Sequence, residues 1–325
     1  MKIPRRRFLH LVAGAAALPA LSRMARAQAY PTRPVRIIVG TPAGGQPDII
    51  ARLMGQWLSD RLGQPFIIEN RPGAGSNIAT EAVIRAPNDG YTLGMGSATS
   101  AINATLYDNL KFNFIRDTAP VAFIGRFPIA LIAHPSFPAR TVSEFLDYSR
   151  SNPGKVSLAT PSKGTGPFMA AALLKMMTGI NVVDVPYRGD NDLITDLLGG
   201  QVQAGFTGIT PSIENIKTGK LRALGVTTAG RAEELPDVPS IGASVSGYEA
   251  SGWSGIVAPK NTSTEIVDRL NKEIGAGLID LKIKGQLAKL GITVLALSPA
   301  DFSKFIADET EKWGKVVKFA GIKSD

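Results

Sequence analysis

A short apolar strand that passes through a glycine turn into a helix is the feature that most restricts the fold of this chain. Val35–Val39 is rich in β-branched residues, Gly44 and Gly45 follow it, and apolar residues with helical spacing begin after Pro47. The start of a helix has unpaired backbone N–H groups and favours negative charge, and a glycine lets a ligand approach the backbone closely. The segment therefore predicts either an anion-binding turn or an ordinary strand–helix connection.

The same pattern of strand, small-residue turn and helix returns in the second half of the chain. Strand-like residues 155–159 lead into the polar turn Thr160–Gly166, and the spacing predicts a helix over 168–177. Other strands and helices alternate with short connections, which favours mainly parallel sheets with helices on both faces. Because ligand-binding turns lie at the carboxyl ends of such strands, we expect an α/β protein with two lobes and a cleft between them.

The N-terminus has the composition of an export signal. Three arginines at 5–7 precede an apolar stretch that is too short to span a bilayer comfortably, and small residues follow it. We predict that residues 1–29 form a signal peptide, cleaved near Ala27 or Ala29, and that the mature protein lies in the periplasm. The arginines also resemble a twin-arginine signal, so the general secretory route and the twin-arginine route both stay open.

The basic character of the chain is concentrated in this predicted leader. The full sequence has 36 Lys and Arg against 27 Asp and Glu, a formal net charge of +9. Residues 1–27 hold six of the basic residues and no acidic one, so 30 basic against 27 acidic residues remain, a net charge of +3. Such a small excess does not favour a nucleic-acid partner and is compatible with an anionic small ligand.

The residues needed for most catalytic and metal sites are missing. The chain has no cysteine, and His134 is the only histidine after the predicted leader, which excludes disulfides, thiolate nucleophiles and Cys/His zinc sites. No phosphate-binding loop, nucleophile elbow or complete dinucleotide fingerprint occurs. We therefore expect a protein that is not an enzyme and that has no cofactor or metal.

Several turns rich in hydroxyls and backbone donors remain as candidate ligand contacts. Such groups can hold a carboxylate through neutral hydrogen bonds and bridging waters. Asp48 is either a first-turn acid favoured by the helix dipole or an acceptor for an ammonium or hydroxyl of the ligand. Arg126 and Arg188 are either carboxylate clamps or structural residues. The candidate turns are Thr41–Asp48, Ser97–Thr99, Ser162–Gly166 and Thr207–Thr210.

A series of motifs in fixed order runs from Tyr30 to about Ile322. This series resembles Bug-type proteins, the periplasmic substrate-binding components of tripartite tricarboxylate transporters. The motifs are Pro42-Ala-Gly-Gly-Gln-Pro-Asp48, Glu69-Asn-Arg-Pro-Gly-Ala-Gly75, Pro87-Asn-Asp-Gly-Tyr-Thr-Leu93, Val185-Pro-Tyr-Arg-Gly189, Asp196-Leu-Leu-Gly-Gly-Gln-Val202 and Trp253-Ser-Gly-Ile-Val-Ala-Pro259.

The resemblance implies a two-lobed periplasmic-binding-protein fold of type II that closes on a small organic acid. Ligands of the family include di- and tricarboxylates, acidic amino acids and aromatic acids, and the partner is a membrane transporter. The first domain is expected to combine 30–125 with 252–325, and the second to span 126–251. The chain would cross between them near Gly125–Phe127 and Ser251–Trp253, and a monomer is expected.

The resemblance also selects the residues that hold the ligand. It places the ligand at the turn Ala43–Gly45 near Asp48 and at a second-lobe turn that acts partly through water. Thr41 stands where the family commonly has an aromatic residue, and Phe168 where a histidine is frequent, which favours an acid with an apolar body. The complete candidate set is Thr41, Ala43, Gly44, Gly45, Asp48, Ser97, Thr99, Ser162, Gly164, Thr165, Gly166, Phe168, Tyr187, Arg188, Gly189 and Thr207.

Two other functions are compatible with these observations. The first is an exported enzyme acting on a carboxylic acid, in which Ser162 would be activated by Lys163 or His134. The second is a sensor that presents its bound ligand to a signalling partner in the membrane.

Overall fold

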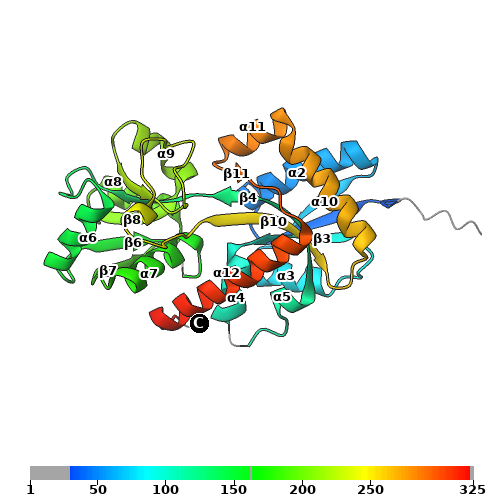
Figure 1. Ribbon diagram of the computed structural model, residues 1–325, viewed down its shortest axis with the longest axis horizontal. Helices are drawn as coiled ribbons and strands as arrows, with labels where there is room; N and C mark the ends of the chain where they lie inside the picture. Colours follow the sequence, from blue (N-terminus) through cyan, green and yellow to red (C-terminus); the bar gives the residue numbers. More distant parts are fainter. Residues whose placement is uncertain (1–29, 108, 162, 323–325) are drawn as a thin grey trace, which may run out of the picture.

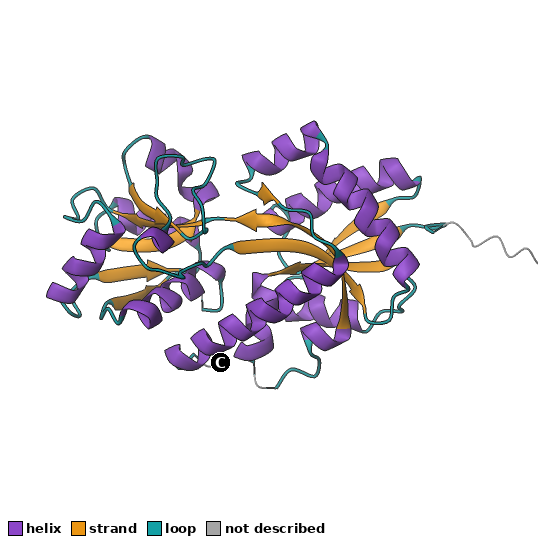
Figure 2. Cartoon of the chain, viewed as in Figure 1, coloured by secondary structure: helices purple, strands orange, loops and turns teal. Residues whose placement is uncertain are grey.

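Two β-sheets, each with its own helices, form two lobes that are joined by extended strands (Figures 1 and 2). The computed structural model describes residues 30–107, 109–161 and 163–322; the predicted leader 1–29 and the candidate Ser162 lie outside them. The first sheet contains β1 (Val35–Val39), β2 (Phe66–Asn70), β3 (Thr92–Ser97), β4 (Thr118–Phe127), β10 (Gly252–Pro259) and β11 (Thr293–Val294). The second contains β5 (Ile129–Ala133), β6 (Ser157–Thr160), β7 (Val183–Pro186), β8 (Ala204–Gly208) and β9 (Arg222–Val226).

The helices follow the strands in the alternation that the sequence predicts. The first lobe has α2 (Gln46–Leu62), η1 (Ala74–Ser76), α3 (Asn77–Ile84), α4 (Ala98–Leu106), α5 (Phe114–Asp117), α10 (Thr264–Ile279), α11 (Leu281–Lys289) and α12 (Pro299–Ala320). The second lobe has α6 (Val142–Ser151), α7 (Gly166–Thr178), α8 (Asp190–Leu198), α9 (Ile209–Lys217) and η2 (Ile241–Ala243). Within the described part of the chain, no helix is both long and apolar enough to cross a membrane.

The two sheets share one strand order. The first runs β2-β1-β3-β10-β4 with β11 at the edge, and the second runs β7-β6-β8-β5-β9. The strands β2-β1-β3 and β7-β6-β8 are parallel, as expected, but β10 and β5 pair antiparallel with both of their neighbours. These two strands enter each sheet directly from the other lobe, so they arrive from the direction opposite to strands that follow a helical crossover.

Local sequence signals account for the helix that follows the first glycine turn. Helix α2 starts after Gly45 with Pro47 in its first turn, a position where the missing N–H of proline costs no hydrogen bond. It ends at Gly63, which has the left-handed φ of 72° that glycine adopts without strain. Asp48 in the first turn is a further signal for a helix start after the turn that follows β1.

The C-terminal helix α12 connects the two lobes. It packs against α4 and β4 in the first lobe and against α7 in the second, and it runs towards α7 in Figure 1. Phe302 and Phe305 of this helix form edge contacts with Trp253 of β10 and Phe123 of β4. One cluster of buried apolar residues therefore extends from the first lobe into the second beside the crossover strands.

Candidate ligand-binding cleft

A cleft of about 430 Å³ lies between the lobes, at the carboxyl ends of the parallel strands of both sheets. The first lobe contributes the turns after β1 and β3 and the loop between α11 and β11, and the second lobe contributes the turns after β6, β7 and β8. The segments that cross between the lobes, at Phe127–Ile129 and Gly252, also line the cleft. The described lining residues are Thr41, Gly44, Gln46, Pro47, Ile49, Ser76, Ser97, Ala98, Thr99, Phe127, Pro128, Ile129, Gly166, Pro167, Asp190, Gly208, Ile209, Thr210, Pro211, Gly252, Ser254, Leu290 and Gly291.

The turn after β1 is held from beneath by Asp48. The Asp48 carboxylate is 1% exposed and accepts hydrogen bonds from Gly44 N at 2.8 Å, Arg52 Nε at 2.9 Å and Asn70 Nδ2 at 2.9 Å. The Arg52 hydrogen bond, helped by those from Gly44 and Asn70, outweighs burial and lowers the pKa of Asp48 to about 2. Asp48 is absent from the described cleft lining, and the Gly44 N–H is directed at this carboxylate.

Gly44 gives the turn an open surface towards the cleft. Its φ of 83° is left-handed, and a Cβ built at this position would meet no atom within 4 Å. Glycine adopts this conformation without the strain that another residue would carry. The turn is thus rigidly tied on its inner side by Asp48 and exposes bare backbone on its outer side.

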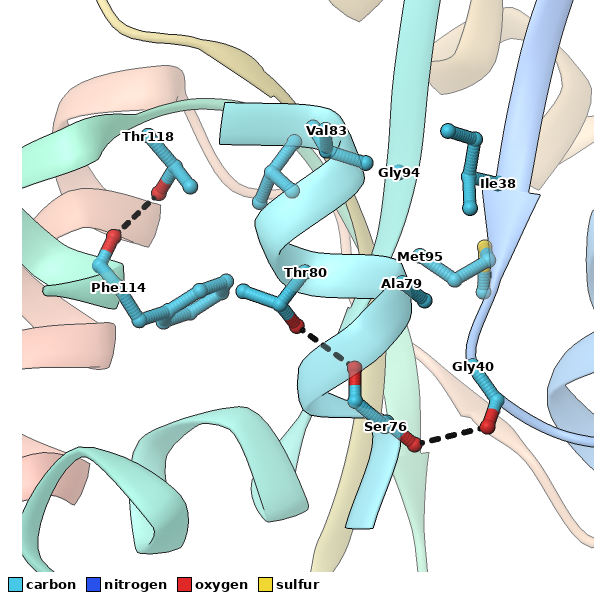
Figure 3. A pocket seen from close by; sticks show the side chains of 11 residues that line it. Ile38, Gly40, Ser76, Ala79, Thr80, Val83, Gly94, Met95, Phe114 and Thr118 are labelled. Carbon is cyan, nitrogen blue, oxygen red and sulfur yellow. Dashed lines mark hydrogen bonds between the residues drawn. The ribbon is translucent and has the colours of Figure 1, made fainter. Parts of the chain in front are cut away.

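A second, much smaller cavity lies behind this turn and is structural. Figure 3 shows it between Ile38 of β1 and the residues of α3. Its volume of about 10 Å³ has room for no more than one water molecule. The Ser76 hydroxyl donates to Gly40 O at 3.1 Å, and the Thr80 hydroxyl donates to Ser76 O at 3.1 Å (Figure 3). These bonds fasten the end of β1 to the start of α3 and so support the turn that faces the main cleft.

The first-lobe side of the cleft is lined by hydroxyl-bearing residues, two of which have unpartnered hydroxyls. Thr41 Oγ1 and Ser254 Oγ are buried and have no hydrogen-bond partner among the described residues, and Ser254 is only 1% exposed. The antiparallel insertion of β10 pairs Ser254 with Ser97, and Thr99 follows at the start of α4. Because buried hydroxyls are usually satisfied, this pair of unpartnered groups marks a place for a ligand or an ordered water.

The second-lobe side is built from three helix starts. Gly166 and Pro167 begin α7, Asp190 begins α8, and the residues from Gly208 to Pro211 begin α9. The buried Thr207 hydroxyl donates to Asp190 Oδ1 at 2.5 Å, and Gly208 N donates to the same oxygen at 3.2 Å. These bonds tie the turn after β7 to the turn after β8, so the second lobe presents a connected surface to the cleft.

The two lobes meet directly at one side of the cleft. Thr210 Oγ1 of α9 donates to Leu290 O at 3.1 Å, and Gln46 Nε2 at the start of α2 donates to the same carbonyl at 2.9 Å. One backbone carbonyl is therefore bound from both lobes at once. The conformation described is one in which the lobes are in contact across the cleft.

The structure brings part of the sequence-predicted site together. Thr41, Gly44, Ser97, Thr99 and Gly166 line the cleft. The remaining predicted residues of the first turn, and the buried Thr207 behind Asp190, support the lining without being part of it. These supporting residues are Ala43, Gly45, Asp48 and Thr207.

Other predicted residues lie beside the cleft or away from it. Gly164 and Thr165 form the turn before α7, and Arg188 and Gly189 lie in the loop between β7 and α8. The Tyr187 hydroxyl donates to Asp196 Oδ2 at 2.8 Å, and burial together with this bond raises the pKa of Tyr187 to about 12. None of these residues is among the described lining of the cleft.

Phe168 faces a different cavity from the one expected. It lines a space of about 90 Å³ between α7 and the end of α12, together with Phe319 and Ile322. It lies within α7, two residues beyond Gly166, and packs against the core that joins α7 to α12. The apolar surface of the main cleft comes instead from Ile49, Phe127, Ile129, Ile209 and Leu290.

His134, which the catalytic hypothesis would use, lies far from the cleft, and Arg126, a candidate carboxylate clamp, lies beside the crossover at Pro128. His134 follows the end of β5 that pairs with the start of β8, whereas the cleft is at the opposite end, where Ile129 pairs with Gly208. Its Nδ1 lies 2.7 Å from Ser136 Oγ. Arg126 forms an ion pair with Glu249 and lies over the Phe305 ring, at a separate hollow near β11. His134 is therefore remote from the cleft, and Arg126 is paired with Glu249 and absent from the described lining.

Sequence reasoning missed the cleft residues Ser254 and Asp190. Ser254 lies inside a motif that we used only for the family resemblance, and its register beside Ser97 depends on the antiparallel insertion of β10. Asp190 directly follows a quoted motif, but nothing local distinguishes it from a helix-capping acid.

Among the described residues, no group of three or more His, Cys, Asp or Glu is placed to hold a metal.

Comparison with known proteins identifies the family. The model of the tripartite tricarboxylate transporter family receptor matches residues 50–322. The chain belongs to this receptor family. It is 33% identical to protein BugT of Bordetella pertussis over 302 residues, which cover 91% of this chain and 92% of BugT. It is also 34% identical to a UPF0065 protein from the tcbD–tcbE intergenic region of Pseudomonas sp. strain P51, with 97% and 94% coverage.

Solved structures that are similar to this chain have the same fold. Rpa4515 of R. palustris, solved with adipate, has a TM-score of 0.78 and 34% identity and covers 90% of this chain and 99% of its own. The periplasmic binding protein BugD has a TM-score of 0.75 and 32% identity, with 91% and 100% coverage. The predicted family and two-lobed α/β fold are confirmed. The relatives are named as receptors and binding proteins, so the chain is a binding protein and not an enzyme.

Proposed function

We propose that this receptor binds a small organic carboxylate in the cleft between its lobes, in the periplasm, and delivers it to a tripartite membrane transporter. The observation that carries the proposal is the convergence of Thr41 Oγ1 and Ser254 Oγ, both unpartnered among the described residues, on one cleft with helix starts from both lobes. Neutral donors of this kind stabilise a carboxylate without a salt bridge. Rpa4515 was solved with adipate and MatC of Rhodopseudomonas palustris with malate, which supports the ligand class.

In this proposal the carboxylate lies against the first-lobe turn and the hydroxyls beside it. Thr41, Ser97, Thr99 and Ser254 donate hydrogen bonds directly or through water, and the backbone at Gly44 allows close approach. The starts of α7 and α9 contribute from the second lobe. Ala43, Gly45, Asp48 and Thr207 support these turns, and Ser162, which lies outside the described residues, stays a predicted ligand contact.

The proposed movement is a hinge closure of two domains, 30–125 with 252–325 and 126–251. The strand crossings at Pro128 and at Ala250–Ser251 support hinges near those boundaries. A ligand that contacts both lobes favours the closed form because it binds that form more tightly. Thr210 and Leu290, which already form a hydrogen bond between the lobes, are expected to separate in the open form. We further propose that residues 1–29 are removed on export and that the mature receptor is a monomer.

The most direct test of this function is a thermal-shift screen with mono-, di- and tricarboxylates. A ligand that binds only the folded receptor adds about 2.7 kcal/mol of stability at a concentration of 100 Kd, so at least one acid should raise the Tm clearly. Mass spectrometry of ligand released from the denatured protein identifies the natural class. If no acid changed the Tm while a sugar or nucleotide raised it, the proposal would be wrong.

A substitution at Thr41 tests the location. Thr41→Val keeps the shape of the side chain and removes its hydroxyl, so affinity for the bound acid should fall about fivefold, or about 1 kcal/mol for one neutral hydrogen bond. Calorimetric titration measures this change. Ser136→Ala, at an exposed position near His134, is the matched control and should bind as the wild type does. Equal affinities for all three proteins would place the ligand elsewhere.

A further inference from the structure

The carboxylate of Asp190 is part of the wall of the cleft. Its Oδ1 is fixed by Thr207 Oγ1 and Gly208 N, at 2.5 and 3.2 Å. No basic side chain in the described part of the chain forms an ion pair with Asp190. The group is therefore held in a fixed position with one oxygen left for another partner.

Asp190 also determines the charge of the cleft. It is the only residue with a charged side chain among the described lining residues, and the others are apolar, glycine, hydroxyl-bearing or amide residues. Basic residues nearby in sequence, Lys163 and Arg188, are exposed and absent from the described lining. The cleft of a carboxylate receptor is thus anionic at one wall.

The structural bonds of Asp190 do not require its charge. The Oδ1 of an asparagine can accept the same two hydrogen bonds, from Thr207 Oγ1 and Gly208 N, with the same geometry. The first turn of α8 already contains Asp192, an exposed acid that interacts favourably with the helix dipole. Asp190 is partly exposed, so water solvates its charge in the open cleft, and a ligand that displaces this water must supply a partner in its place.

We propose that the ligand carries an ammonium group in addition to its carboxylate and that Asp190 binds this ammonium. The inference rests on the proposed function and narrows it to amino-bearing acids. The ligand carboxylate lies against the hydroxyls and backbone donors of the first lobe, and its ammonium reaches across the cleft to the second lobe. A second ligand carboxylate beside Asp190 would place two like charges together with no counter-charge in the described lining.

The rest of the cleft selects the body of this ligand. Ile49 and Leu290 from the first lobe, Ile209 from the second, and Phe127 with Ile129 at the crossover present apolar surface. An apolar ligand body between the carboxylate and the ammonium would pack favourably against these apolar residues. The ligand class is therefore a zwitterion with an apolar body.

Matched pairs of acids that differ only in the amino group test the proposal. Calorimetric titration of the ligand-free mature protein compares leucine with 4-methylpentanoate, free glutamate with glutarate, and free aspartate with succinate. We expect the amino-bearing member of at least one pair to bind ten times more tightly or better, which corresponds to about 1.4 kcal/mol. In the wild type, equal or tighter binding of the deaminated member in every pair would overturn the inference.

The variant Asp190→Asn separates the charge from the fold. It should lose at least tenfold affinity for the amino-bearing acid while the deaminated acid binds unchanged or better. Asp192→Asn, on the same helix but exposed and outside the described lining, is the control and should keep the wild-type preference. A preference that survives in Asp190→Asn with an unchanged Tm would contradict the role of Asp190.

The outcomes also distinguish this inference from the function on which it rests. Binding of deaminated acids alone would leave the carboxylate receptor intact and overturn only the ammonium site. Failure of every acid, amino-bearing or not, to bind the wild type would overturn both.

Discussion

Two aspartates at helix starts, one in each lobe, have opposite surroundings. Asp48 and Asp190 each lie in the first turn of the helix that follows a parallel strand. Asp48 is buried and accepts from Gly44 N, Arg52 and Asn70, whereas Asp190 accepts only at Oδ1 and faces the cleft. The difference arises one helical turn later, where Arg52 pairs with Asp48 but the buried Ile194 follows Asp190. The same residue type thus stabilises a turn in one lobe and is available to a ligand in the other.

Neutralising Asp48 is expected to have the largest effect on stability. Asp48→Asn replaces a buried carboxylate that accepts three hydrogen bonds, so the free energy of unfolding should fall by about 2 kcal/mol. Asp190→Asn retains its hydrogen bonds from Thr207 Oγ1 and Gly208 N and should lose less than about 0.5 kcal/mol. Urea unfolding at pH 7 measures both. Equal losses would mean that the two aspartates do not differ in the way the structure indicates.

The pH dependence of stability gives a second and smaller test of the role of Asp48. Because the pKa of Asp48 is lowered to about 2 in the folded protein, its stabilisation is complete above the unfolded pKa of 3.8 and is lost as the pH falls towards 2. The stability difference between pH 5 and pH 2 should therefore be smaller in Asp48→Asn than in the wild type. Arg52→Gln removes the largest cause of the shift and should give an intermediate result. Asp117, whose pKa is also about 2, contributes equally in all three proteins and so does not obscure the comparison.

The glycines before the two helices give the smallest expected effect. Gly44→Ala forces a left-handed φ of 83° on alanine and should cost about 1 kcal/mol, although a Cβ there meets no atom within 4 Å. Gly189→Ala is the control, because its φ of −170° is extended backbone and its Cβ position is also open. Thermal unfolding without ligand compares the two variants. A loss of the same size in Gly189→Ala would show that left-handed strain is not the cause.

Much of the fold was predictable because its signals are local. The apolar spacing of α2, its proline start and its glycine end all lie within one segment, and so do the strand and turn before it. The ordered motifs then identified the family, which supplied the two-lobed arrangement. The predicted cleft residues Thr41, Gly44, Ser97, Thr99 and Gly166 lie at the ends of strands or in the turns that follow them, where a local pattern is sufficient.

Other features depend on contacts between distant segments and were not predictable from local patterns. The antiparallel entry of β5 and β10 follows from which lobe each strand comes from, and it brings Ser254 beside Ser97. Phe168 was expected at the ligand, but its position within α7 directs it to the space near the end of α12. Each outcome depends on how complete elements pack, which no single segment encodes.

The sequence by itself determined the strands, the glycine turns, the helix starts and the membership of the receptor family, because these are recorded in residues that are neighbours along the chain. Only the tertiary structure decided which polar groups became satisfied and which did not. Arg52 and Asn70 reach Asp48 across the first turn, whereas the described residues bring no cation to Asp190. The free energy of a charged group depends on its burial and on its partners in space, and so the roles of the two aspartates differ only in the folded chain.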